Sequence, residues 1–349
     1  MQKFEYVYQG KTLNNIWQVK RIEKEFNTFI HFQTDLTPYK DSLADGIIDD
    51  NIDYDLNYIK HLRNTKKYIR LFYSGGDDSH NILSKFLDNN IFLDEIVVIT
   101  RNLYNKDSLQ SCDQEIIDQA LPFLKNITSA QVGNIVFKNY DAEFMKALYT
   151  DPEWMFKVPG GELGFRILQP FGYMDGEIND ADCQIVGKEN PILIHYNNKW
   201  YATIEDGSLI DTASLHNACL FYIMPENIKS FIVKARKLRK QLNIDNINSK
   251  FKIYQNAENK NHIINIGKYS GKALLNIKDT RALSEVSSKG DIELITKWVN
   301  SISRLKELFP DMADGFDIKR APEGKFLFFI DIDSLEIFLQ QELIPVGFQ

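Results

Sequence analysis

Apolar and polar positions follow a strand–helix–strand pattern between residues 69 and 100. The apolar run Ile69–Tyr73 has the length and the branched and aromatic content of a buried strand. Apolar residues at helical spacing come next: Ile82, Leu83, Phe86 and Leu87. A second short apolar run, Glu95–Thr100, predicts another strand. These segments together predict a βαβ unit with two parallel strands.

The same alternation continues toward residue 210. Further helical and strand patterns occupy Glu115–Ala120, Asn134–Lys138, Asp141–Leu148 and Cys183–Gly187. Strands that alternate with helices predict an α/β fold, with a parallel sheet, right-handed crossovers and flanking helices. Two more apolar runs, Ile192–Tyr196 and Lys199–Ile204, predict a hairpin around Asn197-Asn198.

We therefore expect three parts: an N-terminal extension (residues 1–66), a central domain (67–210) and a C-terminal region (211–349). The C-terminal region is expected to be mixed α+β, helical at first as far as Gln241 and irregular over residues 244–280. Its last predicted elements are a helix at Asp291–Leu308, a strand at Phe326–Ile332 and a short helix at Ser334–Leu343.

The loop that connects the first predicted strand to its helix has the sequence Ser74-Gly75-Gly76-Asp77-Asp78-Ser79. A glycine-rich turn that opens a helix presents backbone N–H groups to an anion, and glycine lets the backbone approach a phosphate closely. The serines add hydroxyl donors. The carboxylate of Asp78 suits such a place when Mg²⁺ bridges it to phosphate oxygens. A Walker A loop is excluded because no Gly-Lys-Ser/Thr follows, and an ordinary strand-to-helix turn is the alternative.

This loop resembles the PP-loop of the ATP pyrophosphatase superfamily, whose pattern is Ser-Gly-Gly-any-Asp-Ser. The superfamily includes the asparagine, GMP and NAD synthetases, and lone members of this size occur in bacteriophage genomes. The resemblance covers about residues 67–205 and implies a three-layer, Rossmann-like (HUP-like) ATP-binding domain. It departs from the family at Asp77, where members usually carry an apolar residue. Asp77 is therefore a further Mg²⁺ ligand, points away, or indicates altered chemistry.

The resemblance also implies roles for individual residues. Ser74, Gly75, Gly76, Asp78 and Ser79 would bind the phosphates of ATP. Because the first and fourth strands are neighbours in this fold, the segment Gly187-Lys188-Glu189 is expected beside the loop. Asp78 and Glu189 would then share one Mg²⁺, while Lys188 would hold the β- and γ-phosphates and stabilise the departing pyrophosphate. The alternative for this segment is a plain turn.

Two further segments carry weaker expectations. Thr100 and Arg101 end the second strand, where the resemblance implies that backbone groups bind adenine, although Arg101 fits a surface ion pair equally well. The segment Gly160–Arg166 would form a substrate loop in which Glu162 or Arg166 binds an acceptor, or its glycines simply make turns.

Net charge changes the set of expected partners. The chain has a formal net charge of −7, which argues against a large nucleic-acid footprint. One basic cluster lies on a predicted helix and comprises Lys229, Lys234, Arg236, Lys237, Arg239 and Lys240. We interpret it as a solvated helix face over a packed stripe, with a local RNA-contacting strip as the alternative. The acidic stretch Asp45–Asp55 is likewise interpreted as a solvated loop.

The remaining composition points to a cytoplasmic protein without a membrane partner. No apolar stretch approaches the roughly 18 residues that a membrane span requires, and the N-terminus lacks the pattern of a signal peptide. The 3 cysteines are widely separated, which argues against a zinc site. Cys183 is expected to be a small buried residue of a strand.

The resemblance implies an adenylating enzyme that uses ATP and Mg²⁺. An acceptor oxygen would attack the α-phosphorus, releasing pyrophosphate, and an amine or sulfur nucleophile would then displace AMP. The acceptor, a small molecule or a macromolecule, cannot be identified from the sequence. The alternative is a nucleotide-binding structural or regulatory module, for example a phage-associated one, with little turnover.

Overall fold

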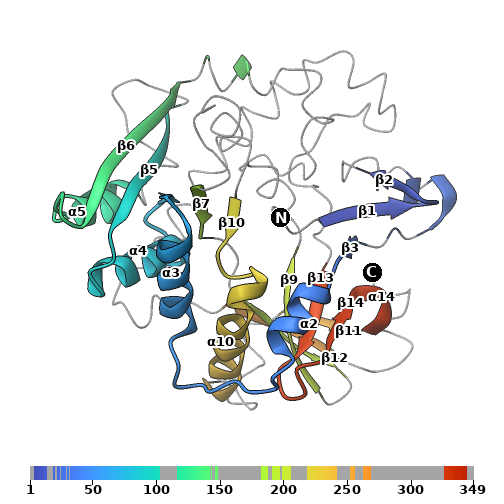
Figure 1. Cartoon of the computed structure of the whole chain (residues 1–349). Helices are drawn as coiled ribbons and strands as arrows, with labels where there is room; N and C mark the ends of the chain where they lie inside the picture. Colours follow the sequence, from blue (N-terminus) through green and yellow to red (C-terminus); the bar gives the residue numbers. More distant parts are fainter. Residues whose placement is uncertain are drawn as a thin grey trace.

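The computed structural model of this 349-residue chain describes most of its first hundred residues and several later segments. The described residues are 4–13, 19, 22–23, 25–28, 30, 32–102, 116–141, 143, 146–147, 182–187, 191–196, 199–205, 218–241, 252–255, 262–268 and 326–343. They form a mixed α/β structure with one parallel and two antiparallel sheets (Figure 1).

The parallel sheet contains the nucleotide-loop candidate. Its five strands, in spatial order, are β10 (Ala218–Leu220), β7 (Asp182–Val186), β4 (Tyr68–Phe72), β5 (Leu93–Asn102) and β6 (Val132–Asp141). All four pairings between neighbours are parallel. Four of these strands confirm the strands expected from the sequence. The fifth, β10, corrects the expectation of a helical segment there.

The strand order reverses between β4 and β7. From β4 the chain moves to β5 and then β6 on one side, whereas β7 returns to the other side of β4 and is followed outward by β10. The registers Ile69↔Cys183 and Phe72↔Val186 place β7 directly beside β4, as the sequence predicted. In open parallel sheets, ligands bind beyond the carboxyl ends of the strands at such a switch point.

Helices cover one face of the parallel sheet. This face buries Ile69 and Leu71 of β4 against α3 (Tyr54–Thr65) and α4 (Asp77–Asp88). A π-helical turn (Ile116–Ala120) and α5 (Leu121–Leu124) join the same core. Alternation along each strand explains the one-sided core, because successive side chains point to opposite faces. Polar residues of the other face, such as Arg70, Glu95 and Gln184, are hydrogen-bonded to one another. The second covering layer of a three-layer fold is not shown among the described residues.

A larger antiparallel sheet joins strands from both sides of residue 210. Its order is β11 (Lys252–Gln255), β12 (His262–Lys268), β8 (Ile192–Tyr196), β9 (Lys199–Glu205), β13 (Phe326–Asp331) and β14 (Ile337–Leu339). The β8–β9 hairpin and the strand at β13 confirm the sequence predictions. The irregular region expected over 244–280 instead contains β11 and β12. The helix expected at Ser334–Leu343 is reduced to α14 (Gln340–Leu343), because β14 precedes it.

Helix α10 (Ile228–Gln241) connects the two sheets. It contacts α3 on one side and β8, β9 and α2 (Thr37–Leu43) on the other (Figure 1). Phe231 packs on Phe328 of β13, with ring centroids 6.5 Å apart. The apolar stripe of α10 is therefore buried, as expected from the sequence. The N-terminal strands β1 (Phe4–Tyr8), β2 (Lys11–Leu13) and β3 (Phe32–Thr34) form a separate antiparallel sheet.

Some predictions fall outside the described residues. The helix expected at Asp291–Leu308 and the glycine-rich segment Gly160–Arg166 both lie there. For the helix expected at Asp141–Leu148, Asp141 is the last residue of β6 and only three later residues of the range are described. Among the described helices, none combines the length and the apolar character that a bilayer crossing requires.

Candidate nucleotide site

Residues 74–76 form a tight turn between β4 and α4, and residues 77–79 are the first three residues of α4. The N–H of Tyr73 still donates to the carbonyl of Val97 on β5, at 2.9 Å, so the chain follows the sheet up to that residue. Gly75 then has a φ of +82°, in the left-handed region that favours glycine. Gly76 caps α4, since its carbonyl accepts the N–H of His80 at 2.9 Å. The chain thus reverses direction within a few residues, because glycine can adopt the left-handed backbone conformation that the turn requires.

The two serines of the loop form hydrogen bonds with the loop's own backbone. The N–H of Ser74 donates to Oγ of Ser79 at 3.3 Å, and the N–H of Gly76 donates to Oγ of Ser74 at 3.2 Å. Oγ of Ser79 also donates to the carbonyl of Gly76 at 3.2 Å. These bonds lie at or just beyond the upper end of the typical ranges, about 3.2 Å for N–H donors and about 3.0 Å for O–H donors, so their exchange for a stronger acceptor costs little. A phosphate oxygen is such an acceptor.

The first turn of α4 supplies further features of an anion site. The first N–H groups of a helix have no acceptor within the helix, and the helix dipole places partial positive charge there. Asp78, half-buried, lies in this turn, and Ser79 is buried behind it. Asp77 is the first residue of α4, and its side chain is not among those described. One carboxylate among backbone N–H groups and hydroxyls fits a phosphate that is bound together with a divalent cation.

The end of β7 touches this loop directly. A Cβ added to Gly187 would lie 2.9 Å from both N and Cα of Ser79. The chain at Gly187, directly after β7, therefore approaches the loop so closely that only glycine fits. This contact confirms that Gly187 and the loop are neighbours, as the sequence predicted. Lys188 and Glu189, the expected phosphate and metal ligands, lie outside the described residues.

Thr100 and Arg101 lie near the same edge of the sheet. In β5, Val97 pairs with Phe72, the last residue of β4, so Thr100 lies three residues beyond the end of β4. At about 3.3 Å per residue this is about 10 Å further along. Thr100 is half-buried and pairs with Asn139 of β6, while Arg101 pairs through its backbone with Tyr140. The side chain of Arg101 is not among those described.

Beside the loop, His80 packs at the start of α4, as its place in the sequence suggests, whereas Tyr222 is a residue that sequence reasoning missed. Nδ1 of His80 and the hydroxyl of Tyr73 form a hydrogen bond of 2.8 Å. The His80 ring packs edge-on against the ring of Phe123, with the two centroids 4.4 Å apart. This packing agrees with a structural place for His80 at the helix start. Tyr222, from the turn after β10, donates to the carbonyl of Asp78 at 2.8 Å. Its hydroxyl carried no signal in the sequence because Tyr222 lies within an apolar run. Cys183 is buried inside β7, as predicted.

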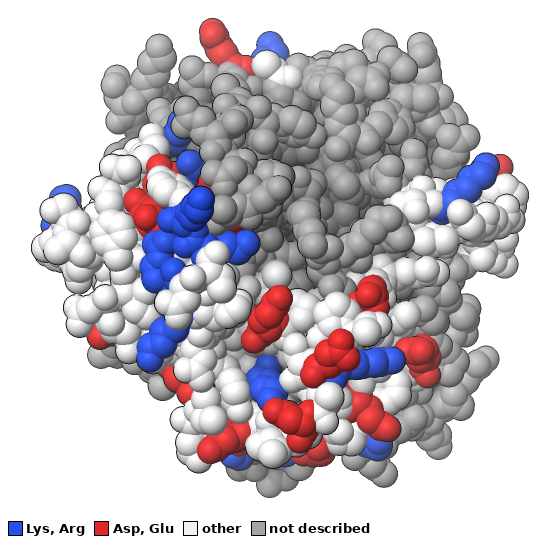
Figure 2. Space-filling view, in the orientation of Figure 1, with Lys and Arg blue, Asp and Glu red and all other residues white. Residues whose placement is uncertain are grey.

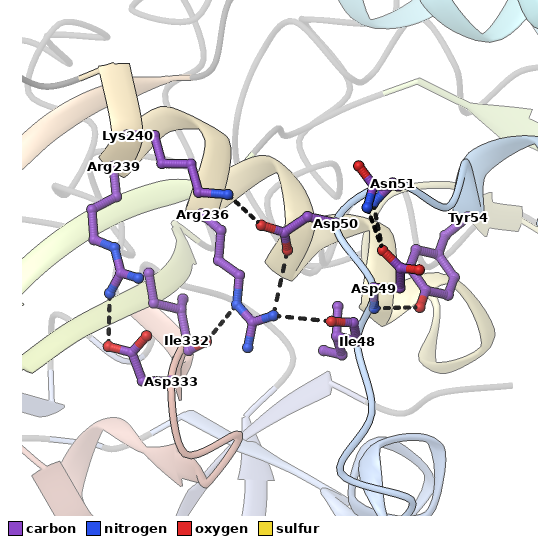
Figure 3. Close-up of polar contacts among 10 residues, drawn as sticks. All are labelled: Ile48, Asp49, Asp50, Asn51, Tyr54, Arg236, Arg239, Lys240, Ile332 and Asp333. Atoms are coloured by element: carbon purple, nitrogen blue, oxygen red, sulfur yellow. Dashed lines mark hydrogen bonds and ion pairs between the residues drawn. The ribbon is translucent and has the colours of Figure 1, made fainter.

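The basic cluster of α10 is largely neutralised by carboxylates (Figure 3). Lys240 and Arg236 both contact Asp50, at 2.7 and 3.4 Å. Arg236 also donates to the carbonyl of Ile332 at 2.8 Å. Two other pairs join Lys229 to Asp45 at 2.6 Å and Arg239 to Asp333 at 2.7 Å. Figure 2 accordingly shows acidic and basic side chains intermixed over the lower part of the view, where α10 and α2 lie. This pairing leaves little free positive charge for an RNA strip.

One pair of this cluster is buried, which corrects two expectations. Lys234 Nζ lies 2.8 Å from Asp55 Oδ2, and both side chains are almost inaccessible to solvent. Lys234 is therefore not on a solvated face, and Asp55, at the start of α3, is not in a solvated loop. Burial alone would raise the pKa of Asp55, but Lys234 and hydrogen bonds from Ser230 and Asn227 hold it below its ordinary value. Burial lowers the pKa of Lys234, and Asp55 partly offsets that effect.

Two comparisons were made with the sequence, one against family models and one against curated proteins. No family model matches the sequence, and a search of curated proteins finds no significant match. Within the described segments, no group of three or more His, Cys, Asp or Glu side chains is arranged to hold a metal ion. Of the two carboxylates in the loop, Asp78 is the one whose side chain the structure describes.

Proposed function

We propose that this chain is an ATP-dependent adenylating enzyme of the PP-loop ATP pyrophosphatase type. The observation that carries the proposal is the position of the Ser74–Ser79 loop. It follows the central strand β4 at the point where strand order reverses, and it packs against Gly187 at the end of β7. Nucleotide sites of open parallel sheets occupy this place, and the loop has the hydrogen-bond donors that phosphates require.

In this proposal the chain positions ATP by its phosphates. The N–H groups of Gly75, Gly76 and the first turn of α4, together with the hydroxyls of Ser74 and Ser79, would bind the phosphate oxygens that depart as pyrophosphate. Asp78 would hold Mg²⁺, with Glu189 as the second carboxylate, and Mg²⁺ would neutralise charge on the phosphates. Lys188 would contact the outer phosphates, and the backbone at Thr100 and Arg101 would contact adenine.

The reaction follows from that arrangement. An acceptor oxygen forms a bond to the α-phosphorus while the bond from that phosphorus to the β-bridging oxygen breaks. The products are an acceptor adenylate and pyrophosphate, and a nucleophile then displaces AMP. Such chemistry depends on orientation and on stabilisation of charge by fixed dipoles. It uses no catalytic thiol or imidazole, which agrees with the buried Cys183 and the packed ring of His80.

Product analysis tests the proposal. ATP labelled at the α-phosphate is incubated with the protein, Mg²⁺ and a panel of carboxylate and nucleobase acceptors, and the products are separated by chromatography. We expect labelled AMP or an adenylate, with one pyrophosphate released for each, and loss of both in Asp78→Asn. ADP and phosphate as the only products would contradict the mechanism. Tight ATP binding without turnover on any acceptor would favour a nucleotide-binding regulatory module instead.

A further inference from the structure

Three segments that are distant in sequence meet at the ring of Tyr222. Its hydroxyl contacts the first turns of α4, its ring lies under a lysine of α10, and that lysine is paired with an acid of α3. Tyr222 itself is fully buried in the turn after β10. These contacts converge directly behind the Ser74–Ser79 loop.

The direction of the Tyr222 hydrogen bond is fixed by its neighbours. Nδ2 of Asn81 donates to the hydroxyl oxygen at 3.2 Å, while the hydroxyl donates to the carbonyl of Asp78 at 2.8 Å. Nζ of Lys234 lies 3.6 Å from the centroid of the ring. A cation over the face of a phenol attracts the ring and holds it in place, and the effect is larger in a desolvated position. Lys234 is buried and paired with Asp55, so it cannot move away easily.

Holding the carbonyl of Asp78 also orients an N–H of the loop. The Asp78 carbonyl and the Ser79 N–H belong to the same planar trans peptide unit, in which they point in opposite directions. Both groups lie in the first turn of α4, so a bond that holds the carbonyl on the Tyr222 side further restricts the N–H, which points toward the N-terminal end of the helix, where an anion would bind. The same bond limits the rotation of the backbone that carries the Asp78 carboxylate.

We infer that Tyr222 is a positioning residue for the phosphate loop, with Lys234 holding its ring and Asn81 its hydroxyl. It orients the Ser79 N–H and the Asp78 carboxylate for a nucleotide polyphosphate. The inference rests on the proposed function for its ligand, although the orientation of the peptide unit is a property of the protein alone. It assigns a role to a buried tyrosine outside the loop motif.

The experiment compares two buried tyrosines in the full chain. Tyr222→Phe removes the hydroxyl and keeps the ring under Lys234. Tyr39→Phe is the matched control, because the Tyr39 hydroxyl is equally buried and donates to the carbonyl of Ile223, at 2.9 Å, without touching α4. The readouts are the ¹H–¹⁵N signal and hydrogen exchange rate of the Ser79 amide without ligand, the unfolding free energy, and the affinity for MgATP by calorimetry.

We expect Tyr222→Phe to shift the Ser79 amide signal and to speed its exchange, and Tyr39→Phe to leave both unchanged. Affinity for MgATP should fall roughly fivefold in Tyr222→Phe alone, the scale of one hydrogen bond. Should Tyr222→Phe fail to fold, Asn81→Ala, on a partly exposed position, should speed exchange of the Ser79 amide, because it removes the donor that holds the Tyr222 hydroxyl in place. An unchanged Ser79 amide, or equal changes in the two tyrosine variants, would overturn the inference. If wild-type protein binds no MgATP, the proposed function fails, while the amide comparison still decides the role of Tyr222.

Discussion

Gly187 is the residue at which one added carbon atom most directly affects the candidate site. Its Cβ would lie 2.9 Å from the backbone of Ser79 and 3.0 Å from Cδ1 of Ile82. Backbone atoms cannot rotate away from such a contact as a flexible side chain can. Gly187→Ala must therefore displace either the end of β7 or the first turn of α4.

We expect Gly187→Ala to lower the unfolding free energy by about 1–3 kcal/mol, the scale of overpacking, and to weaken MgATP binding about tenfold. Gly133→Ala is the control, because its Cβ would lie 2.7 Å from the Asp94 carbonyl oxygen, far from the loop. It should lose stability but keep its affinity. Urea unfolding and calorimetry measure both quantities. Equal MgATP affinities in Gly187→Ala and Gly133→Ala would show that Gly187 does not contribute to the nucleotide site.

At the residue scale, the sequence predicted the loop but not what supports it. Glycines and serines in a short turn identify Ser74–Ser79 because their chemistry is local. The Tyr222 hydroxyl and the buried Lys234 depend on contacts between segments more than a hundred residues apart. Lys234 lies between two and six residues from the other basic residues of α10, and nothing in that spacing distinguishes the single buried member.

Among the elements, α10 shows how acidic and basic segments stabilise each other. Its apolar stripe predicted a helix, but the partners of its basic side chains come from residues 45–55 and 332–333. The Asp55–Lys234 pair differs from the rest because it is buried, whereas Asp45 and Lys229 are at the surface. A buried charge that loses its partner is costly, whereas an exposed pair is screened by water.

We expect Asp55→Asn to destabilise the protein by about 3–5 kcal/mol, since it leaves Lys234 as an unpaired buried cation. Asp45→Asn makes the same chemical change at an exposed pair and should have little effect. Chemical denaturation of the two variants measures the difference. Similar small losses in both would show that the Asp55–Lys234 pair is not desolvated.

The same carboxylates predict the dependence of stability on pH. In the folded protein the pKa of Asp55 lies below the ordinary value of 3.8, so the unfolded chain binds more protons in the interval between the two values. The stability that Asp55 contributes is therefore present above that ordinary value and is lost as pH falls through the folded pKa. Lys240 and Arg236 likewise lower the pKa of Asp50 against the opposing effect of burial. Asp55→Asn should flatten the acid limb of the stability profile.

For the whole molecule, the sequence predicted the parallel sheet better than the antiparallel one. Apolar runs alternating with helical periods specify β4, β5, β6 and β7, and the neighbouring positions of β4 and β7 followed from the resemblance to a known loop. The larger antiparallel sheet pairs segments as distant as β9 and β13. Pairing between distant segments produces no periodic signal in the local sequence. In addition, β11 and β12 lie in a stretch rich in Asn and Lys, residues that are depleted in strands.

The candidate loop follows β4, the central strand of the parallel sheet, and so does not lie at a free edge of that sheet. Helix α10 contacts α3 on one side and the antiparallel sheet on the other, and Tyr222 connects this arrangement to α4. The boundaries expected at residues 66 and 210 remain predictions. What the architecture establishes is that a glycine-rich turn lies at the switch point of a parallel sheet.

Calorimetric titration of MgATP into the wild-type chain and into Gly76→Val measures whether the Ser74–Ser79 loop binds phosphate. We expect one site on the wild-type protein. We expect no measurable binding in a Gly76→Val variant that unfolds cooperatively like the wild type, because the valine side chain fills the space that a phosphate requires. Unchanged affinity in the folded variant, or no binding of MgATP to the wild-type chain, would contradict the assignment of Ser74–Ser79 as a phosphate loop.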